Sequence, residues 1–181
     1  MKAKFLEGKN IYLSPLSKED DVGDYTQWLN DQETTFWMYC GKFPSSAQAL
    51  RKYIDDYNKC KDGILLGIFA RKTAAHIGNI TLHKIDSKNR CAEIGILIGD
   101  KKSRGKGYAT QALKLVVEHA FYKLNLRRLF ANIVENNKAS IKIFEKTGFK
   151  KEGTLREHFY NGDKYYDCYF YGLLKDEYHH S

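Results

Sequence analysis

The 181-residue chain has little proline, no paired cysteines and no long apolar run. Its two prolines mark no proline-rich linker, and no repeat or low-complexity tract divides the sequence. The four cysteines form no C-x-x-C pair and the six histidines no H-x-x-x-H pattern, so we expect reduced thiols and no metal site. Since neither a membrane-spanning stretch nor a signal-peptide core is present, we expect a cytoplasmic protein that does not associate with membranes.

What the chain does have is an ordinary globular composition and an excess of positive charge. Hydrophobic residues make up 43% and charged residues 29%, with a formal net charge of +8. This length suits one domain over residues 1–181, with its core at about 10–175. The charge suggests an acidic partner, which could be nucleic acid, a nucleotide-like cofactor or a phosphorylated substrate. Nucleic acid is the weaker alternative, because the chain lacks an RNA-binding signature, zinc spacing and a basic helix.

Apolar periodicity and turn residues indicate an alternation of strands and helices. The first helix should begin at an N-cap, Ser17, and a strand–loop–helix–strand unit over residues 90–134 should form one crossover. The order predicts a mixed α/β (α+β) fold with a mostly antiparallel sheet and helices on its faces. Strands are expected near 10–16, 63–72, 75–86, 90–100, 127–134, 149–157 and 164–174, and helices near 17–30, 45–60, 109–124 and 137–147.

The stretch SRGKGYATQAL, residues 103–113, places two glycines and two cations directly before a helix. Glycine lets the backbone approach a ligand closely, and the first turn of a helix offers free N–H groups and a positive dipole end to an anion. A dinucleotide-binding fingerprint would need a third glycine, and a P-loop would need G-K-[ST]. Both are absent, so the loop predicts an anion site of another kind.

Four pieces in order carry a family resemblance. From Lys102 the loop reads K-S-R-G-K-G, which fits [QR]-x-x-G-x-[GA] except for its lysine; AEIGILIGD precedes it, and NKASIKIFEKTGF and EGTLRE follow. Over roughly residues 10–175 the chain resembles the GNAT superfamily of acetyl-CoA-dependent N-acyltransferases, in particular the RimJ/RimL-type branch. The resemblance implies a sheet of about seven strands whose fourth strand splays from the fifth, and direct transfer of acetyl from acetyl-CoA to a primary amine.

The resemblance also implies where the cofactor binds. The glycine loop should hold the coenzyme A pyrophosphate, and the backbone of the splayed strand, Ala92–Gly99, should line the pantetheine and stabilise the oxyanion. Asn137 is implied at the pantetheine arm. The implied cofactor contacts are Ile96, Leu97, Ile98, Lys102, Ser103, Arg104, Gly105, Lys106, Gly107, Tyr108, Ala109, Thr110, Asn137, Ser140 and Phe144.

Two residues are candidates for the chemistry. Glu93 is the sole carboxylate in an apolar strand beside the loop and could serve as the base that deprotonates the amine; the alternative is that it caps a neighbour or faces solvent. Many family members have a proton-donating tyrosine where this chain has Phe144. Ser140, one helical turn earlier, could instead donate a hydrogen bond to the departing sulfur.

The acceptor site should lie at the first two helices and the last hairpin, with Glu33, Trp37, Tyr39 and His158 as wall residues. A protein N-terminus, an amino sugar or nucleotide sugar, or another small amine could be the acceptor. The basic charge disfavours a polyamine, although a cluster of acids near the pocket would reverse that. A homodimer is expected by analogy only. A non-catalytic acyl-CoA-binding domain stays open as an alternative, because Phe144 and Lys102 depart from the family pattern.

Overall fold

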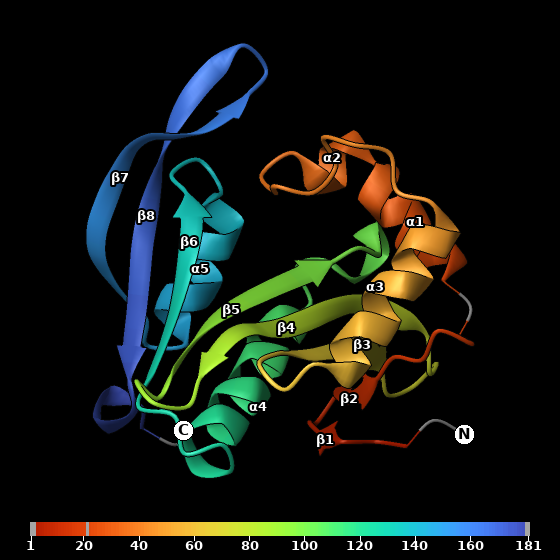
Figure 1. Cartoon of the computed structure of the whole chain (residues 1–181), viewed down its shortest axis with the longest axis horizontal. Coiled ribbons are helices and arrows are strands. Elements are labelled where there is room, and N and C mark those ends of the chain that lie inside the picture. The colour runs from red at the N-terminus through yellow and green to blue at the C-terminus, as the bar shows by residue number, and fades with distance from the viewer. Residues whose placement is uncertain (1–2, 21, 180–181) are drawn as a thin grey trace.

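A single eight-stranded sheet organises the computed structural model, which describes residues 3–20 and 22–179 (Figure 1). Its order is β1-β2-β3-β4-β5-β6-β8-β7, and only β5 and β6 pair in parallel. The mostly antiparallel sheet with one crossover is thus confirmed. The strands are β1 (Leu6–Glu7), β2 (Ile11–Pro15), β3 (Ile64–Ala70), β4 (His76–Asp86), β5 (Cys91–Ile98), β6 (Arg128–Val134), β7 (Lys150–Asn161) and β8 (Lys164–Leu174).

The count of about seven strands is corrected to eight. The additional strand is β1, which has two residues and pairs with β2. Two residues are too few to show the alternation by which a strand is recognised in a sequence.

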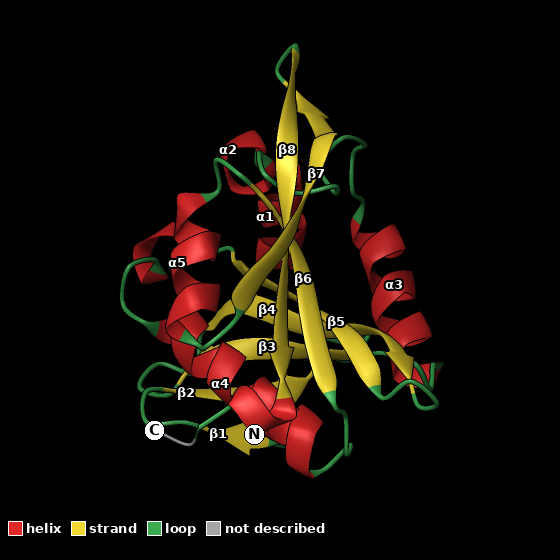
Figure 2. Ribbon diagram, turned by 90° about the vertical axis from the view of Figure 1, so that its left-hand side faces the viewer, coloured by secondary structure: helices red, strands yellow, loops and turns green. Residues whose placement is uncertain are grey.

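Helices cover both faces of the sheet. Figure 2 shows the sheet nearly edge-on, with α4 and α5 on one side and α3 on the other. None of the helices in the described ranges is long and apolar enough to cross a membrane. The helices are α1 (Gly23–Asn30), α2 (Gln32–Thr35), α3 (Ala47–Lys59), α4 (Tyr108–Tyr122) and α5 (Lys138–Lys146), with short 3₁₀ turns η1 (Lys101–Ser103) and η2 (Lys175–Glu177).

The expected start of the first helix at Ser17 is wrong. The Ser17 N–H donates to Asp20 Oδ2 at 2.7 Å, and the Ser17 hydroxyl accepts from the Glu19 N–H, which closes a local turn. The helix begins at Gly23, after an N-cap, Val22, whose side chain makes no capping bond. Serine and aspartate offer the backbone such local bonds in competition with a helix, so the same residues that signal a cap can form a turn instead.

Two apolar layers hold the helices to the sheet. The larger lies under α4, where Leu113, Val117 and Phe121 are fully buried against strand residues such as Leu129. The smaller lies under α1 and α3 and has Ile54 at its centre. The predicted apolar face of α4 is therefore confirmed, and it anchors the crossover between β5 and β6.

The parallel strands β5 and β6 stay together for only a short distance. Their register holds for three residue pairs, Cys91↔Arg128, Ala92↔Leu129 and Glu93↔Phe130. Beyond Glu93, β5 continues beside β4 as far as Ile98, while β6 continues beside β8. The two strands diverge in Figure 1, which confirms the splay that the family resemblance implies. Each strand consequently has one edge with backbone groups that no neighbouring strand pairs.

We expect the anchoring of α4 to dominate stability. Leu113→Ala should lower the free energy of unfolding by about 2–5 kcal/mol, because it leaves a cavity in the larger apolar layer. The control is Leu155→Ala on the exposed surface of β7, which should change it by less than about 0.5 kcal/mol. Urea denaturation followed by circular dichroism measures both values. Equal effects of the two substitutions would contradict the role given to the α4 layer.

Candidate active site

A cavity of about 550 Å³ occupies the opening between β5 and β6. It reaches both faces of the sheet, because its walls come from α1–α3 and the segment after α2 on one side and from α5 on the other. Residues 93–97 of β5 and 131–134 of β6 form its sides. The splay of the strands therefore creates a cavity that can hold a ligand.

One strand contributes a polar row to this cavity. On β4, Asn79, Thr81 and His83 line it, and the apolar residues between them face the α4 layer. Sequence reasoning missed these residues, although the alternation N-x-T-x-H in NITLH was a signal that could have found them. In the ladder, Thr81 lies opposite Gly95 and His83 opposite Glu93. A Cβ at position 95 would lie 3.4 Å from His83 Nε2, so the glycine leaves room for the imidazole.

His83 is held by hydrogen bonds at both ring nitrogens. Nδ1 bonds with the hydroxyl of Tyr57, and Nε2 lies 2.7 Å from the hydroxyl oxygen of Thr81. Burial lowers the pKa of His83, and the nearby charge of Glu93 acts in the opposite direction. Since the lowered pKa favours a neutral ring, Tyr57 can donate to Nδ1 while Nε2–H donates to Thr81.

Glu93 lines the cavity as expected for a residue at the reaction centre. Its carboxylate Oε2 lies 3.1 Å from Lys84 Nζ, and 23% of its side chain is exposed. It is therefore partly buried and has a charged partner, which combines features of both alternatives considered from the sequence. Its role as a base stays a prediction.

The glycine loop presents free backbone donors. Gly105 and Gly107 have φ values of 75° and 78°, a region that favours glycine, and a Cβ built on either would meet nothing within 4 Å. Gly107 caps α4 without a side-chain bond, and the N–H groups of residues 105–110 donate to no acceptor among the described residues. The exposed side chains of Lys102 and Lys106 form no ion pair with the described residues. This arrangement suits a multiply charged anion.

Two other predicted cofactor residues use their side chains to hold this loop. Arg104 donates through Nε to the Ile98 carbonyl at 3.1 Å and through a terminal nitrogen to Thr34 Oγ1 at 2.7 Å. The hydroxyl of Ser103 donates to Asp100 at 2.6 Å. The guanidinium group of Arg104 thus links the end of β5 to α2 through these hydrogen bonds.

The predicted acceptor residues divide into two groups. Trp37 and Tyr39 line the cavity, but Glu33 and His158 do not. Glu33 instead accepts from Lys101 Nζ at 2.7 Å, while His158 lies behind Tyr39 with a ring-centroid distance of 6.5 Å. The structure therefore does not bring these two residues to the cavity and pairs each with another side chain.

The predicted cofactor residues of α5 do reach the cavity. Asn137, Ser140 and Phe144 line it from the side opposite Trp37, together with Ile96 and Leu97 of β5. The Asn137 side chain caps α5 by accepting from the Ser140 N–H at 3.2 Å. Phe144 is buried in the larger apolar layer.

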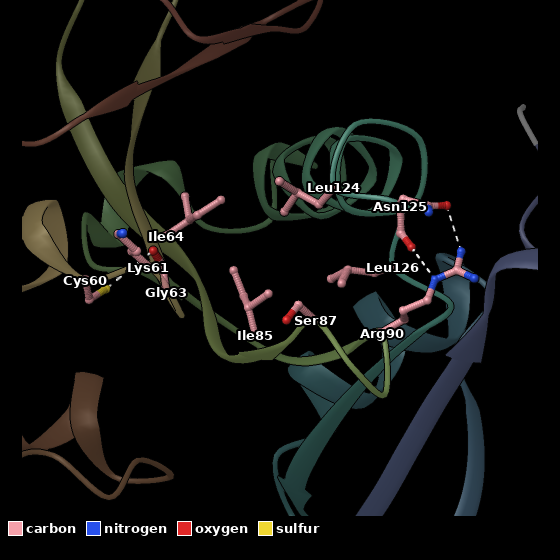
Figure 3. A pocket seen from close by; sticks show the side chains of 10 residues that line it. All are labelled: Cys60, Lys61, Gly63, Ile64, Ile85, Ser87, Arg90, Leu124, Asn125 and Leu126. Carbon is pink, nitrogen blue, oxygen red and sulfur yellow. Dashed lines mark hydrogen bonds between the residues drawn. The ribbon is translucent and has the colours of Figure 1, made fainter.

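A second cavity, of about 380 Å³, lies at the other end of β4 and β5 (Figure 3). Arg90 closes one side of it by donating to the carbonyl and side-chain oxygens of Asn125 at 2.8 and 2.7 Å. No carboxylate lines it, and the eight residues of β5 separate it by about 25 Å from the glycine loop. The first cavity is therefore the candidate active site.

Comparisons with known proteins agree with this geometry. The family described as "Acetyltransferase (GNAT) domain" matches residues 10–150. The "Uncharacterized N-acetyltransferase p20" of Bacillus licheniformis is 32% identical over 161 residues, which is 88% of this chain and 90% of the relative. Spermidine N(1)-acetyltransferase of Escherichia coli (strain K12) is 33% identical over 157 residues, covering 86% of this chain and 81% of the relative.

Solved structures show the same fold. A crystal structure of a probable acetyltransferase superposes with a TM-score of 0.84 at 31% identity, covering 94% of this chain and 96% of the other. Spermidine N-acetyltransferase from Vibrio cholerae, in complex with CoA and spermine, gives a TM-score of 0.85 at 22% identity over 94% of this chain and 99% of the other. With the family match over most of its length, the chain belongs to the GNAT family of acetyltransferases and is an N-acetyltransferase whose acyl donor is acetyl-CoA.

Proposed function

We propose that the enzyme transfers the acetyl group of acetyl-CoA directly to a primary amine that enters the cavity from the side of α1–α3. The observation that carries this proposal is the single cavity through the splay. It joins the α5 wall, where Ser140 lies, to Glu93 of β5 and to the polar row of β4. An amine from one face and a thioester from the other can therefore meet without a covalent enzyme intermediate.

The donor binds along the route from the glycine loop into the splay. The free N–H groups of residues 105–110 hold the pyrophosphate, and Lys102 and Lys106 add positive charge. The pantetheine follows the unpaired edge of β5 along residues 96–98. Asn137 and Phe144 support this arm from α5.

The chemistry requires a base and an oxyanion site. An alkylammonium with a pKa of about 10 must lose a proton before its nitrogen can attack, and Glu93 accepts that proton directly or through water. As the N–C bond forms, unpaired N–H groups of β5 stabilise the carbonyl oxygen. The C–S bond then breaks, and coenzyme A leaves as a thiolate whose sulfur accepts a hydrogen bond from Ser140. This thiolate, directly or through water, takes the second proton of the attacking nitrogen, so that a neutral amide and the thiol of coenzyme A are formed. A thiol with a pKa of about 8.5 can leave without a general acid.

The acceptor class and the cellular setting of the enzyme are less closely constrained than the reaction. Relatives that acetylate spermidine support a small amine as acceptor. Membership of the RimJ/RimL-like branch, a cytoplasmic location, a single domain and a homodimer stay predictions.

The glycine loop is tested by Gly107→Ala. The added methyl disfavours the left-handed conformation by about 1–2 kcal/mol and occupies the space in front of the free N–H groups, so the Kd for acetyl-CoA should rise about tenfold. Isothermal titration calorimetry measures this value. The control is Gly153→Ala, where an added methyl meets nothing and φ is not in the left-handed region; its Kd should not change. Equal Kd values for the two variants would remove the loop from the binding site.

The base is tested by Glu93→Gln. The amide keeps the shape of the side chain but cannot take a proton at neutral pH, so kcat should fall by about 10²–10⁴-fold while the Kd for acetyl-CoA stays the same. Release of free coenzyme A thiol measures kcat. Asp62→Asn, an acid-to-amide change at an exposed residue outside the cavity, is the matched control. A loss smaller than about twofold in Glu93→Gln would exclude Glu93 as the base.

A further inference from the structure

Two buried polar atoms in the described part of the chain have no hydrogen-bond partner, and both belong to residues that line the active-site cavity. They are Asn79 Nδ2, a donor, and Asn132 Oδ1, an acceptor. A buried polar atom without a partner destabilises a protein unless a ligand or water satisfies it. Because both lie in the same cavity, they indicate what a ligand there must offer.

The two asparagines line the same cavity from strands on opposite sides of the splay. Asn79 lies on β4 opposite Leu97 of β5, and Asn132 lies on β6, which pairs with β5 no further than Phe130. The Asn79 residue is 4% exposed, and its Oδ1 lies 3.0 Å from His76 Nε2, which leaves the NH₂ group free.

The cavity has little negative charge with which to hold a polyamine. Among the described residues that line it, Glu93 is the sole carboxylate, and none is lysine or arginine. The nearest acids of α2 and its cap are already paired, since Asp31 and Glu33 both bind Lys101 at 2.9 and 2.7 Å. Placing several ammonium groups beside one carboxylate would leave most of them without a counter-charge. The cluster of free acids that would favour a polyamine is therefore absent from the described walls.

Four aromatic side chains stand among the apolar residues that line the acceptor side. Tyr25, Trp37, Tyr39 and Tyr53 line the cavity on the side of α1–α3. Such rings favour an apolar or aromatic body.

We infer that the acceptor is a monoamine with an apolar or aromatic body and a carbonyl or hydroxyl oxygen beside its amine. Asn79 donates to that oxygen and Asn132 accepts from an N–H of the amine. Glu93, which also pairs with the exposed Lys84 Nζ at 3.1 Å, is the one carboxylate of the walls and suits a single amine. This inference rests on the proposed function. It separates this chain from relatives named for spermidine, because a polyamine consists of N–H donors and has no oxygen to offer Asn79.

Three amines test the inference with the full chain and acetyl-CoA. L-Phenylalaninamide has one aliphatic amine, an aromatic body and a carbonyl; 2-phenylethylamine lacks the carbonyl; spermidine has neither ring nor oxygen. We expect kcat/KM to be at least about tenfold higher for L-phenylalaninamide than for spermidine. A higher kcat/KM for spermidine would overturn the inference but not the proposed function. Acetylation of no primary amine, with acetyl-CoA still bound, would overturn the proposed function itself.

Substitution of the asparagines identifies the groups responsible. In Asn79→Leu, the ratio of kcat/KM for L-phenylalaninamide over 2-phenylethylamine should fall at least about tenfold. The difference in pKa between the two amines cancels, because it is the same for every variant. Asn132→Leu should lower kcat/KM for both amines and keep their ratio. Asn89→Leu, at the exposed β4–β5 turn, is the matched control and should change neither. An unchanged ratio in a folded Asn79→Leu protein would overturn the inference.

Discussion

The parting of two parallel strands is the constraint on which the rest of this structure depends. Beside Glu93 the ladder between β5 and β6 ends, and each strand stays with its other partner. Buried backbone groups need hydrogen-bond partners, so the open edges create a demand that a polar ligand can meet. The cavity and the unpaired backbone edge of β5 both follow from this one break in pairing, and the proposed route of the two substrates depends on it. The apolar layer under α4 stabilises both strands below the break.

Ion pairs and a hydrogen bond connect the segment after β5, on the donor side, to α2, on the acceptor side. Lys101 and Arg104, which follow β5, bind the acids and the threonine of α2, and α2 leads directly into the aromatic wall of the acceptor side. Individual exposed ion pairs contribute about 0–1 kcal/mol, so their main effect here is to position the loop. Lys102 and Lys106, in contrast, are exposed and form no ion pair with the described residues, which is why the proposed phosphate site uses them.

The donor side of the site could be predicted from the sequence to a greater extent than the acceptor side. The fold and the conformation of the glycine loop could be predicted, since α4 has a regular apolar face and Gly105 and Gly107 have few uses outside a left-handed turn. That the loop binds the cofactor stays a prediction. The acceptor side could not be predicted. The carboxylate of Glu33 looks the same in a sequence whether it faces a substrate or Lys101, and Ser17 looks the same as a cap or as part of a turn.

The sequence by itself determined the local elements and the chemistry they could offer: periodic strands and helices, a glycine loop for an anion, and one carboxylate in an apolar strand. These depend on residues close together in the chain. Only the tertiary structure decided which polar groups remain without partners. Asn79 and Asn132 are 53 positions apart in the chain, and both line one cavity because β5, which lies between their strands, separates from β6. Burial and pairing are properties of neighbours in space, and such neighbours follow from the register and the splay of the sheet.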